Sequence, residues 1–405
     1  MHSMTSSASL TTLPELSADE RAHSERVAEH IRTFIRAQGG TIGFDAYMRM
    51  ALYAPGLGYY SAGATKLGAG GDFTTAPEVS DLFSRCLARQ TADVLRDTGG
   101  DVLELGAGSG RMAADVLTEL ATMECLPGKY RILEVSADLA ERQRARIAQL
   151  PPELRQRVEW LDHWPERQMR GVVLANEVLD AMPVDRFVLH SREGGIDVRA
   201  LGVGLRGEGF EWRERSPTAE LMHAVADIVE SLPAPLPDGY VSEVCLSFHP
   251  WIASVAQILE QGVAFLVDYG LPRAHLYHPE RSSGTLRCHF RHRAHDDPFV
   301  HVGLQDITAW VDFTRVSEAA DDAGLEVMGF ATQAAFLIGA GMESLLSTEM
   351  ELAGDDMRRK AELAGQARKL MLPGEMGEIF KVIALARGYD APLAGFATQD
   401  LRGSL

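Results

Sequence analysis

Residues 102–110 read Val102-Leu-Glu-Leu-Gly-Ala-Gly-Ser-Gly110, a short apolar run followed by three glycines at alternate positions. The apolar run is typical of a buried β-strand, and Met112 to Leu120 continues with apolar residues at helical spacing. The segment therefore predicts a strand, a glycine turn and a helix. Such a turn brings the backbone close to a ligand, because glycine has no Cβ and readily adopts positive φ.

The spacing of these glycines distinguishes between two classes of cofactor. A dinucleotide-binding turn follows G-x-G-x-x-G, and its third glycine would fall on Arg111. Here Glu104 precedes Gly106, Gly108 and Gly110, a pattern that resembles the first motif of class I S-adenosylmethionine (SAM) methyltransferases. A carboxylate suits a cofactor with a sulfonium and an amino group, whereas it repels a pyrophosphate. A tight turn in another α/β protein is the alternative, because a glycine triplet alone is a weak signal.

The composition limits the possible classes of protein. The chain has 405 residues, of which 46% are hydrophobic, enough for one large decorated domain or several smaller ones. A formal net charge of -18 disfavours nucleic-acid binding and is compatible with a basic protein partner or a cationic side chain as substrate. Scattered cysteines indicate a reducing compartment, and no apolar run is long enough to span a membrane. Because the first 20 residues lack Lys and Arg, we expect no targeting signal and a cytoplasmic location.

Strand-like and helix-like segments alternate after residue 101, which predicts a doubly wound, Rossmann-like α/β sheet. We divide the chain into a loose tail (1–17), a helical extension with a lid loop (18–98), the main domain (99–387) and a C-terminal tail (388–405). Insertions are expected at about 187–245, 271–305 and 334–377, and residues 187–215 have the short alternating runs of a β-meander. Insertions at the carboxyl ends of strands often shape a substrate pocket.

Polar residues end several expected strands, where a nucleoside would bind. We expect Glu134 to accept hydrogen bonds from ribose hydroxyls and Asp162 to contact the adenine amine, with a solvated carboxylate and an ordinary turn residue as the alternatives. The loop Gly71-Asp-Phe-Thr-Thr-Ala-Pro-Glu78 is a predicted lid, since it begins a helix whose amides favour the cofactor's carboxylate. The expected cofactor contacts are Glu104, Gly106, Ala107, Gly108, Gly110, Glu134, Asp162, Asn176, Asp72, Thr74 and Pro77.

The methyl acceptor is expected at Asn176-Glu-Val-Leu-Asp-Ala-Met-Pro183, which follows the fourth expected strand. Glu177 and Asp180 would point the same way if the segment is helical, and paired carboxylates hold a guanidinium through bidentate bonds. We predict that both are catalytic residues in a pocket facing the methyl group. A helix cap is the alternative for Asp180. Adenine methyltransferases place a proline and an aromatic ring where Glu177 and Val178 stand, which disfavours base methylation.

Three histidines, His289, His292 and His295, recur at three-residue intervals in the basic segment 286–297. The surrounding arginines would repel a divalent cation, so we expect no metal site there. A loop over the active site or a substrate contact is the favoured interpretation.

Together these motifs resemble the MidA-like family of SAM-dependent methyltransferases, whose mitochondrial members assist assembly of respiratory complex I. The resemblance covers about Phe44 to Arg387 and is specific because many motifs occur in one order. Beyond the segments quoted above, the matching motifs are Tyr53-Ala-Pro-Gly-Leu-Gly-Tyr-Tyr60, Glu134-Val-Ser-Ala-Asp-Leu139, Asp268-Tyr-Gly270, Asp306-Ile-Thr-Ala-Trp-Val-Asp-Phe313 and Met376-Gly-Glu-Ile-Phe-Lys381.

The resemblance implies a class I methyltransferase fold, SAM as cofactor, S-adenosylhomocysteine as product and an arginine acceptor in a protein such as a respiratory-complex subunit. His301-Val-Gly-Leu-Gln305 and His289-Phe290 depart from the family pattern, which leaves the identity of the substrate open. Two other functions fit the same fold and cofactor. One is methylation of another protein or small-molecule acceptor, and the other is a SAM-binding assembly factor without turnover.

Overall fold

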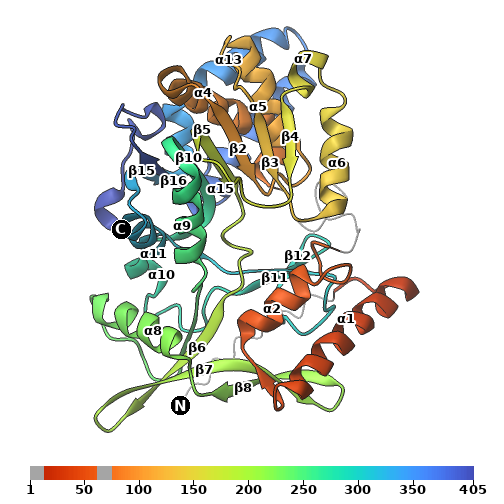
Figure 1. The fold of residues 1–405 in the computed structure, drawn as a ribbon, viewed down its shortest axis with the longest axis vertical. Helices are drawn as coiled ribbons and strands as arrows, with labels where there is room; N and C mark the ends of the chain where they lie inside the picture. The colour runs from red at the N-terminus through yellow and green to blue at the C-terminus, as the bar shows by residue number, and fades with distance from the viewer. Residues whose placement is uncertain (1–12, 62–74) are drawn as a thin grey trace.

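The computed structural model describes residues 13–61 and 75–405. A large sheet occupies the upper half of the molecule in Figure 1, and a smaller sheet with α1, α2 and α8 forms the lower half. The chain passes from the large sheet to the smaller sheet after β5 and returns to the large sheet at β10. The insertion after β5 therefore lies below the large sheet in this view.

The large sheet is the predicted doubly wound α/β sheet, with the strand order β15-β16-β10-β5-β2-β3-β4 and β14 beside β10. Strands β10, β5, β2, β3 and β4 run parallel, whereas β16 is antiparallel to both of its neighbours. Their bounds are β2 (Asp101–Leu105), β3 (Tyr130–Leu133), β4 (Val158–Leu161), β5 (Met169–Asn176), β10 (Leu259–Leu271), β14 (Val311–Asp312), β15 (Glu326–Thr332) and β16 (Phe380–Arg387). The direction of winding reverses between β2 and β5, which is where α/β sheets bind ligands.

Both faces of the large sheet are buried, which explains the continuous apolar runs of its central strands. Val172 and Leu174 of β5 pack in one core with α4 and α5, while Val173 and Ala175 pack in the other with α9 and α11. The covering helices are α4 (Asp81–Thr98), α5 (Arg111–Thr122), α6 (Ala137–Ile147), α7 (Pro152–Arg155), α9 (Phe248–Ile258) and α11 (Phe313–Asp322).

The smaller sheet combines the first insertion with the N-terminal extension. Strands β6 (Asp185–Arg192), β7 (Gly195–Arg206) and β8 (Gly209–Arg215) form the predicted meander, joined by β9 (Tyr240–Val244) and by β1 (Thr41–Ile42), which pairs with β7. Helices α1 (Ala18–Ala37), α2 (Phe44–Tyr53) and α8 (Ala219–Ser231) complete this half. The predicted unit 18–98 is therefore divided in space, because α4 packs in the core of the large sheet.

The helix expected after the loop 71–78 is α4, and a separate short helix, α3 (Ala76–Val79), precedes it. Ser80 between them is extended, with φ -161° and ψ 144°, and its hydroxyl accepts a hydrogen bond from the backbone N of Leu82 at 3.3 Å. A serine that caps a helix in this way ends the preceding turn, which periodicity alone does not detect.

The C-terminal segment covers the β15 edge of the large sheet. Residues 388–405 pack along β15 rather than hanging free, with Phe396 buried and the Leu401 backbone N donating to the Phe330 carbonyl at 2.6 Å. Among the helices that the structure describes, none combines the length and apolar character needed to cross a bilayer. Strands β11 (Arg287–Phe290), β12 (Arg293–His295) and β13 (Asp306–Thr308) form a third sheet, in the order β12-β11-β13. The remaining helices are α10 (Arg273–Leu276), α12 (Gln333–Gly339), α13 (Met342–Leu352), α14 (Met357–Met371), α15 (Met376–Ile379), η1 (Ala394–Phe396) and η2 (Arg402–Ser404).

Gly171 of β5 allows β5 to approach β2 closely at the centre of the large sheet, and replacing it should destabilise the protein. It has φ +120°, and an added Cβ would lie 2.1 Å from the carbonyl oxygen of Asp101 on β2. We expect Gly171→Ala to lower the free energy of unfolding by about 1–3 kcal/mol in urea titrations, as overpacking does. Gly365→Ala on α14 is the matched control, because its Cβ would meet nothing within 4 Å and alanine favours a helix. Equal stability of the two variants would contradict this explanation.

Candidate active site

A cavity of about 530 Å³ opens at the carboxyl ends of β2, β3 and β5, where the sheet reverses its winding. Its volume is in the range of small-molecule sites. At one end it is lined by the glycine turn and Glu134, and at the other by Tyr53, Tyr60 and Glu177. Residues that are distant in the sequence therefore share one site.

The glycine turn has the backbone conformation that its sequence predicts. Gly106, Gly108 and Gly110 have φ values of +67°, +52° and +77°, and α5 begins directly afterwards. The Gln143 side chain on α6 supports the turn by donating from Nε2 to the Gly108 carbonyl at 3.0 Å. An added Cβ at Gly110 would lie 3.1 Å from the Gln143 backbone, so a larger residue would push α6 away.

Two carboxylates flank the turn. Glu104 is 1% exposed yet lines the cavity, and it accepts a hydrogen bond from the Tyr130 hydroxyl at 2.6 Å. Burial raises the pKa of Glu104 to about 7, so a cationic ligand would favour its ionised form. Glu134 accepts from the Ser136 backbone N and from Gln143 Nε2, both at 2.8 Å, which fixes its carboxylate at the cavity wall.

The end of β5 supplies a buried amide and a buried carboxyl group. The Asn176 side chain donates from Nδ2 to Glu177 Oε1 at 3.0 Å, and its Oδ1 is buried without a hydrogen-bond partner among the described residues. Because Asn176 lines the cavity, this unpartnered oxygen is a candidate acceptor for a hydrogen bond from a ligand. Glu177 has φ +53°, a conformation uncommon for a residue with a side chain and often found at functional sites. Burial raises the pKa of Glu177 to about 8.

Asp180 is placed differently from the prediction. The segment after Asn176 is not helical, because Glu177 has left-handed backbone, so Glu177 and Asp180 do not share a helical face. Asp180 is 5% exposed and does not line the cavity; it accepts a hydrogen bond from the Tyr269 hydroxyl. Its backbone N donates to the buried Asp268 carboxylate at 3.2 Å, so Asp180 lies in the protein interior and not at the cavity wall with Glu177.

The N-terminal extension supplies an aromatic wall. The rings of Tyr53 and Tyr60 stack with centroids 5.4 Å apart and planes inclined by 26°. Their hydroxyls are held by hydrogen bonds at 2.8 Å, from Tyr53 to the Ala181 carbonyl and from Tyr60 to Asp306 Oδ1. Both rings line the cavity beside Glu177 and have little freedom to move.

The other predicted residues have different positions. Ala107 and Pro77 line the cavity. Asp72 and Thr74, which belong to the predicted lid, lie outside the described residues. Asp162 does not line the cavity; its side chain is 91% exposed and is hydrogen-bonded to His163. The exposure follows from its position beyond the end of the edge strand β4.

The basic segment 286–297 lies on β11 and β12 and contributes nothing to the cavity lining, contrary to the interpretation as a loop over the active site. Arg291 instead contacts Glu20 of α1. Within the described ranges 13–61 and 75–405, no group of three or more His, Cys, Asp or Glu side chains is arranged to hold a metal ion.

Sequence reasoning missed several lining residues that come from outside the recognised strand ends. They are Arg49, Trp164 and Trp251, whereas Met182, which also lines the cavity, belongs to the expected acceptor segment 176–183. A signal was available only for the tyrosines, whose aromatic and glycine-rich segment 53–60 is unusual for a surface loop.

Comparisons with known proteins bear on this site. The profile of one protein family, described as "Putative S-adenosyl-L-methionine-dependent methyltransferase", matches residues 86–331. A Burkholderia thailandensis protein crystallised with S-adenosyl-homocysteine is 41% identical, with a TM-score of 0.90 and coverage of 97% of this chain and 100% of that chain. The "Protein arginine methyltransferase NDUFAF7 homolog, mitochondrial" of Drosophila melanogaster is 29% identical over 95% of this chain and 91% of its own length. Human "Protein arginine methyltransferase NDUFAF7, mitochondrial" is 25% identical over 85% and 80%.

The names of these relatives correct one prediction. The curated relatives from fly, zebrafish and mouse are mitochondrial proteins, which contradicts the expected cytoplasmic location. The absence of Lys and Arg from the first 20 residues was therefore a poor guide to location.

We predict that Glu134→Gln weakens binding of S-adenosylhomocysteine by about 1–3 kcal/mol, because a charged acceptor for the ribose hydroxyls is lost. Isothermal calorimetry measures this directly. Glu141→Gln on the exposed face of α6 is the control and should bind normally. An unchanged affinity in Glu134→Gln would show that this carboxylate serves only to hold Gln143.

Proposed function

The chain belongs to this family of S-adenosyl-L-methionine-dependent methyltransferases, and on that premise we propose that it methylates an arginine side chain of a protein. The predicted family, fold, activity and cofactor are confirmed by the comparisons. The arginine acceptor is our proposal, supported by the names of the curated relatives and by the buried carboxyl group of Glu177.

The cavity residues fit the cofactor in shape and chemistry. We place its methionine part beside the glycine turn and Glu104, and its ribose against Glu134. The unpartnered Oδ1 of Asn176 can accept a hydrogen bond from the cofactor's amino group. When bound, SAM supplies an activated methyl group on a sulfonium. The protein therefore needs only to align the acceptor nitrogen with that methyl group and to exclude water.

Glu177 is the residue that we assign to the acceptor. Its carboxyl group lies in the cavity next to Asn176, at the end of the strand that adjoins the glycine turn. A guanidinium would offset the burial that raises the pKa of Glu177 and would form charge-assisted hydrogen bonds with its carboxylate. Tyr53 and Tyr60 form a wall against which a guanidinium can stack.

The transfer releases one proton, and Glu177 can take it. The nitrogen lone pair forms the new N–C bond while the electrons of the S–C bond move to sulfur. The nitrogen then loses a proton, which restores the delocalised guanidinium of the product. In this proposal the ionised carboxylate of Glu177 lies beside the guanidinium and is placed to accept that proton. Asp180 does not contact the substrate in this proposal. It accepts a hydrogen bond from the Tyr269 hydroxyl.

The class of protein substrate is also a proposal. The motifs that resemble the MidA-like family favour a respiratory-complex subunit, and the net charge of -18 favours a basic segment of that partner. Incubating the protein with cell lysate and methyl-labelled SAM, and identifying the labelled residue by mass spectrometry, tests both statements. Label on a residue other than arginine would contradict the proposed acceptor.

Glu177→Gln should separate methyl transfer from cofactor binding. The amide keeps the size of the side chain but cannot offer a charged partner to a guanidinium. We expect methyl transfer to the labelled substrate to fall at least about tenfold, or roughly 1.4 kcal/mol, with little change in S-adenosylhomocysteine affinity. Glu166→Gln, on an exposed segment before β5, should behave like the unmodified protein. Normal transfer by Glu177→Gln would remove the main support for the arginine acceptor.

The pH dependence of kcat/KM should report the same carboxyl group. Because burial raises the pKa of Glu177 to about 8, its neutral form predominates below that pH in the free protein. The ionised form is needed to hold the guanidinium, so kcat/KM should rise as pH increases through about 8. In Glu177→Gln this rise should be absent. A pH profile that is identical in the two proteins would assign the titration to another group.

A further inference from the structure

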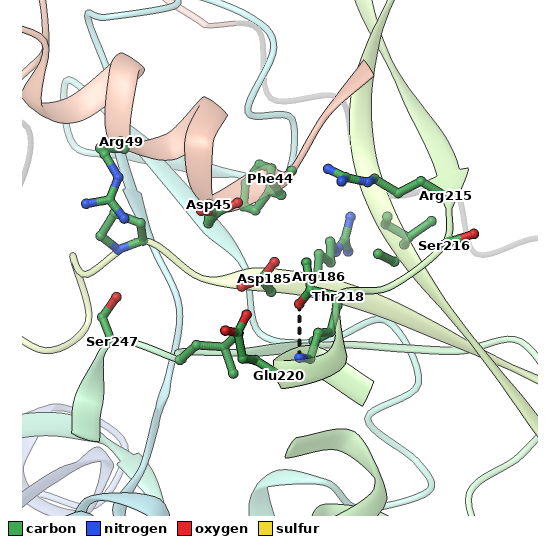
Figure 2. Close-up of a pocket in the computed structure, with 16 residues that line it drawn as sticks. Phe44, Asp45, Arg49, Asp185, Arg186, Arg215, Ser216, Thr218, Glu220 and Ser247 are labelled. Carbon is green, nitrogen blue, oxygen red and sulfur yellow. Dashed lines mark hydrogen bonds between the residues drawn. The ribbon is translucent and has the colours of Figure 1, made fainter. Parts of the chain in front are cut away.

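We propose that a second cavity, beside the first, binds a basic side chain that flanks the methylated arginine in the protein substrate. The inference rests on the proposed arginine acceptor. The second cavity has a volume of about 280 Å³ and lies between α2, the β6–β8 meander and the start of α8. Figure 2 shows its charged residues arranged around one hollow.

The two cavities have common walls. Arg49 and Pro183 line both of them. Along α2, Asp45 lines only the second cavity and Tyr53 only the first, so the helix runs from one cavity to the other. Eight residues of helix span about 12 Å, which an extended peptide covers in about three to four residues. A substrate segment with its arginine beside Glu177 can thus reach the second cavity.

The second cavity holds more acidic than basic side chains that lack a partner. Its carboxylates are Asp45 on α2, Asp185 on β6 and Glu220 on α8, and its unpaired guanidiniums are those of Arg49 and Arg215. Within the described part of the chain, none of these five side chains forms a hydrogen bond or an ion pair. Arg186 also lines the cavity, but it is bonded to Glu243 at 3.0 Å and stacks on Trp212 at 4.6 Å. When all of these groups are ionised, one negative charge is unmatched, which suits a single cation.

The arrangement of the charges favours a cation over an anion. In Figure 2, Asp185 and Glu220 lie between Arg49 on one side and Arg215 on the other. Burial, and then the nearby Asp45 carboxylate, raises the pKa of Asp185 to about 7. An arginine or lysine side chain placed between these carboxylates would offset both effects, whereas an anion would add to the repulsion. The partial exposure of Asp185 and the exposure of Glu220 leave the hollow accessible to a peptide.

Peptides with two arginines test the proposal. We would measure kcat and KM for acetyl-Arg-(Gly)n-Arg-amide, with one to four glycines, and for the same peptides with one arginine replaced by citrulline. Citrulline is a neutral group of the same shape. At the best spacing the second arginine should lower KM by roughly tenfold with little change in kcat, as a charge-assisted contact remote from the reaction would. The second arginine should also strengthen binding of the peptide to the protein loaded with S-adenosylhomocysteine, relative to the citrulline peptide.

Variants assign the effect to the second cavity. Asp185→Asn and Glu220→Gln should each remove most of the gain from the second arginine, while the citrulline peptides keep their kcat and KM. Glu230→Gln, at the exposed far end of α8, should retain the gain, and thermal unfolding should confirm that all variants are folded. Equal KM values for the arginine and citrulline peptides, or a gain that survives in both cavity variants, would overturn this inference alone. Failure to methylate any arginine peptide would overturn the proposed function as well.

Discussion

The pairing of β2 with β5 is the constraint on which the site depends. Their register places Leu105 opposite Ala175, so Gly106 and Asn176 leave the sheet side by side. Because the two strands are parallel, both chains leave at the same edge, and the winding reverses there without a helix to cover it. A ligand held by the backbone of one strand end is thereby brought within reach of the side chains of the other.

The rest of the cavity is built by elements outside the large sheet. Tyr53 and Tyr60 come from the N-terminal extension, and their hydroxyls are fixed by Ala181 and Asp306. The extension is held in turn by β1, which pairs with β7 of the inserted meander at Thr41 and Gly204. These two segments, which are separated in the chain by β2, β3, β4 and β5, therefore support each other and together form the proposed acceptor side.

The sequence predicts the sheet well because its rules are local. The glycine turn and the meander at 187–215 follow from spacing and periodicity within a few residues. The positions of Asp162 and Asp180 did not follow from the sequence pattern. A strand-end residue contacts a ligand only if its strand lies near the point where the winding of the sheet reverses and if its backbone turns toward the ligand. Asp162 ends an edge strand, and the left-handed backbone at Glu177 turns Asp180 into the core. Arg49 and the tryptophans reach the cavity through tertiary packing, for which the sequence carries no local signal.

The position of helix α2 affects how substrate specificity can change in this protein. The proposed cofactor contacts lie at the ends of strands of the large sheet, whereas the walls farther from the glycine turn come from α2 and from the segment that follows residue 180. Mutational drift in these outer segments can alter which partner is accepted while the chemistry at the sheet edge is preserved. Related chains could thus diverge in substrate while sharing one cofactor site, with the N-terminal helices acting as the part of the enzyme that selection adjusts.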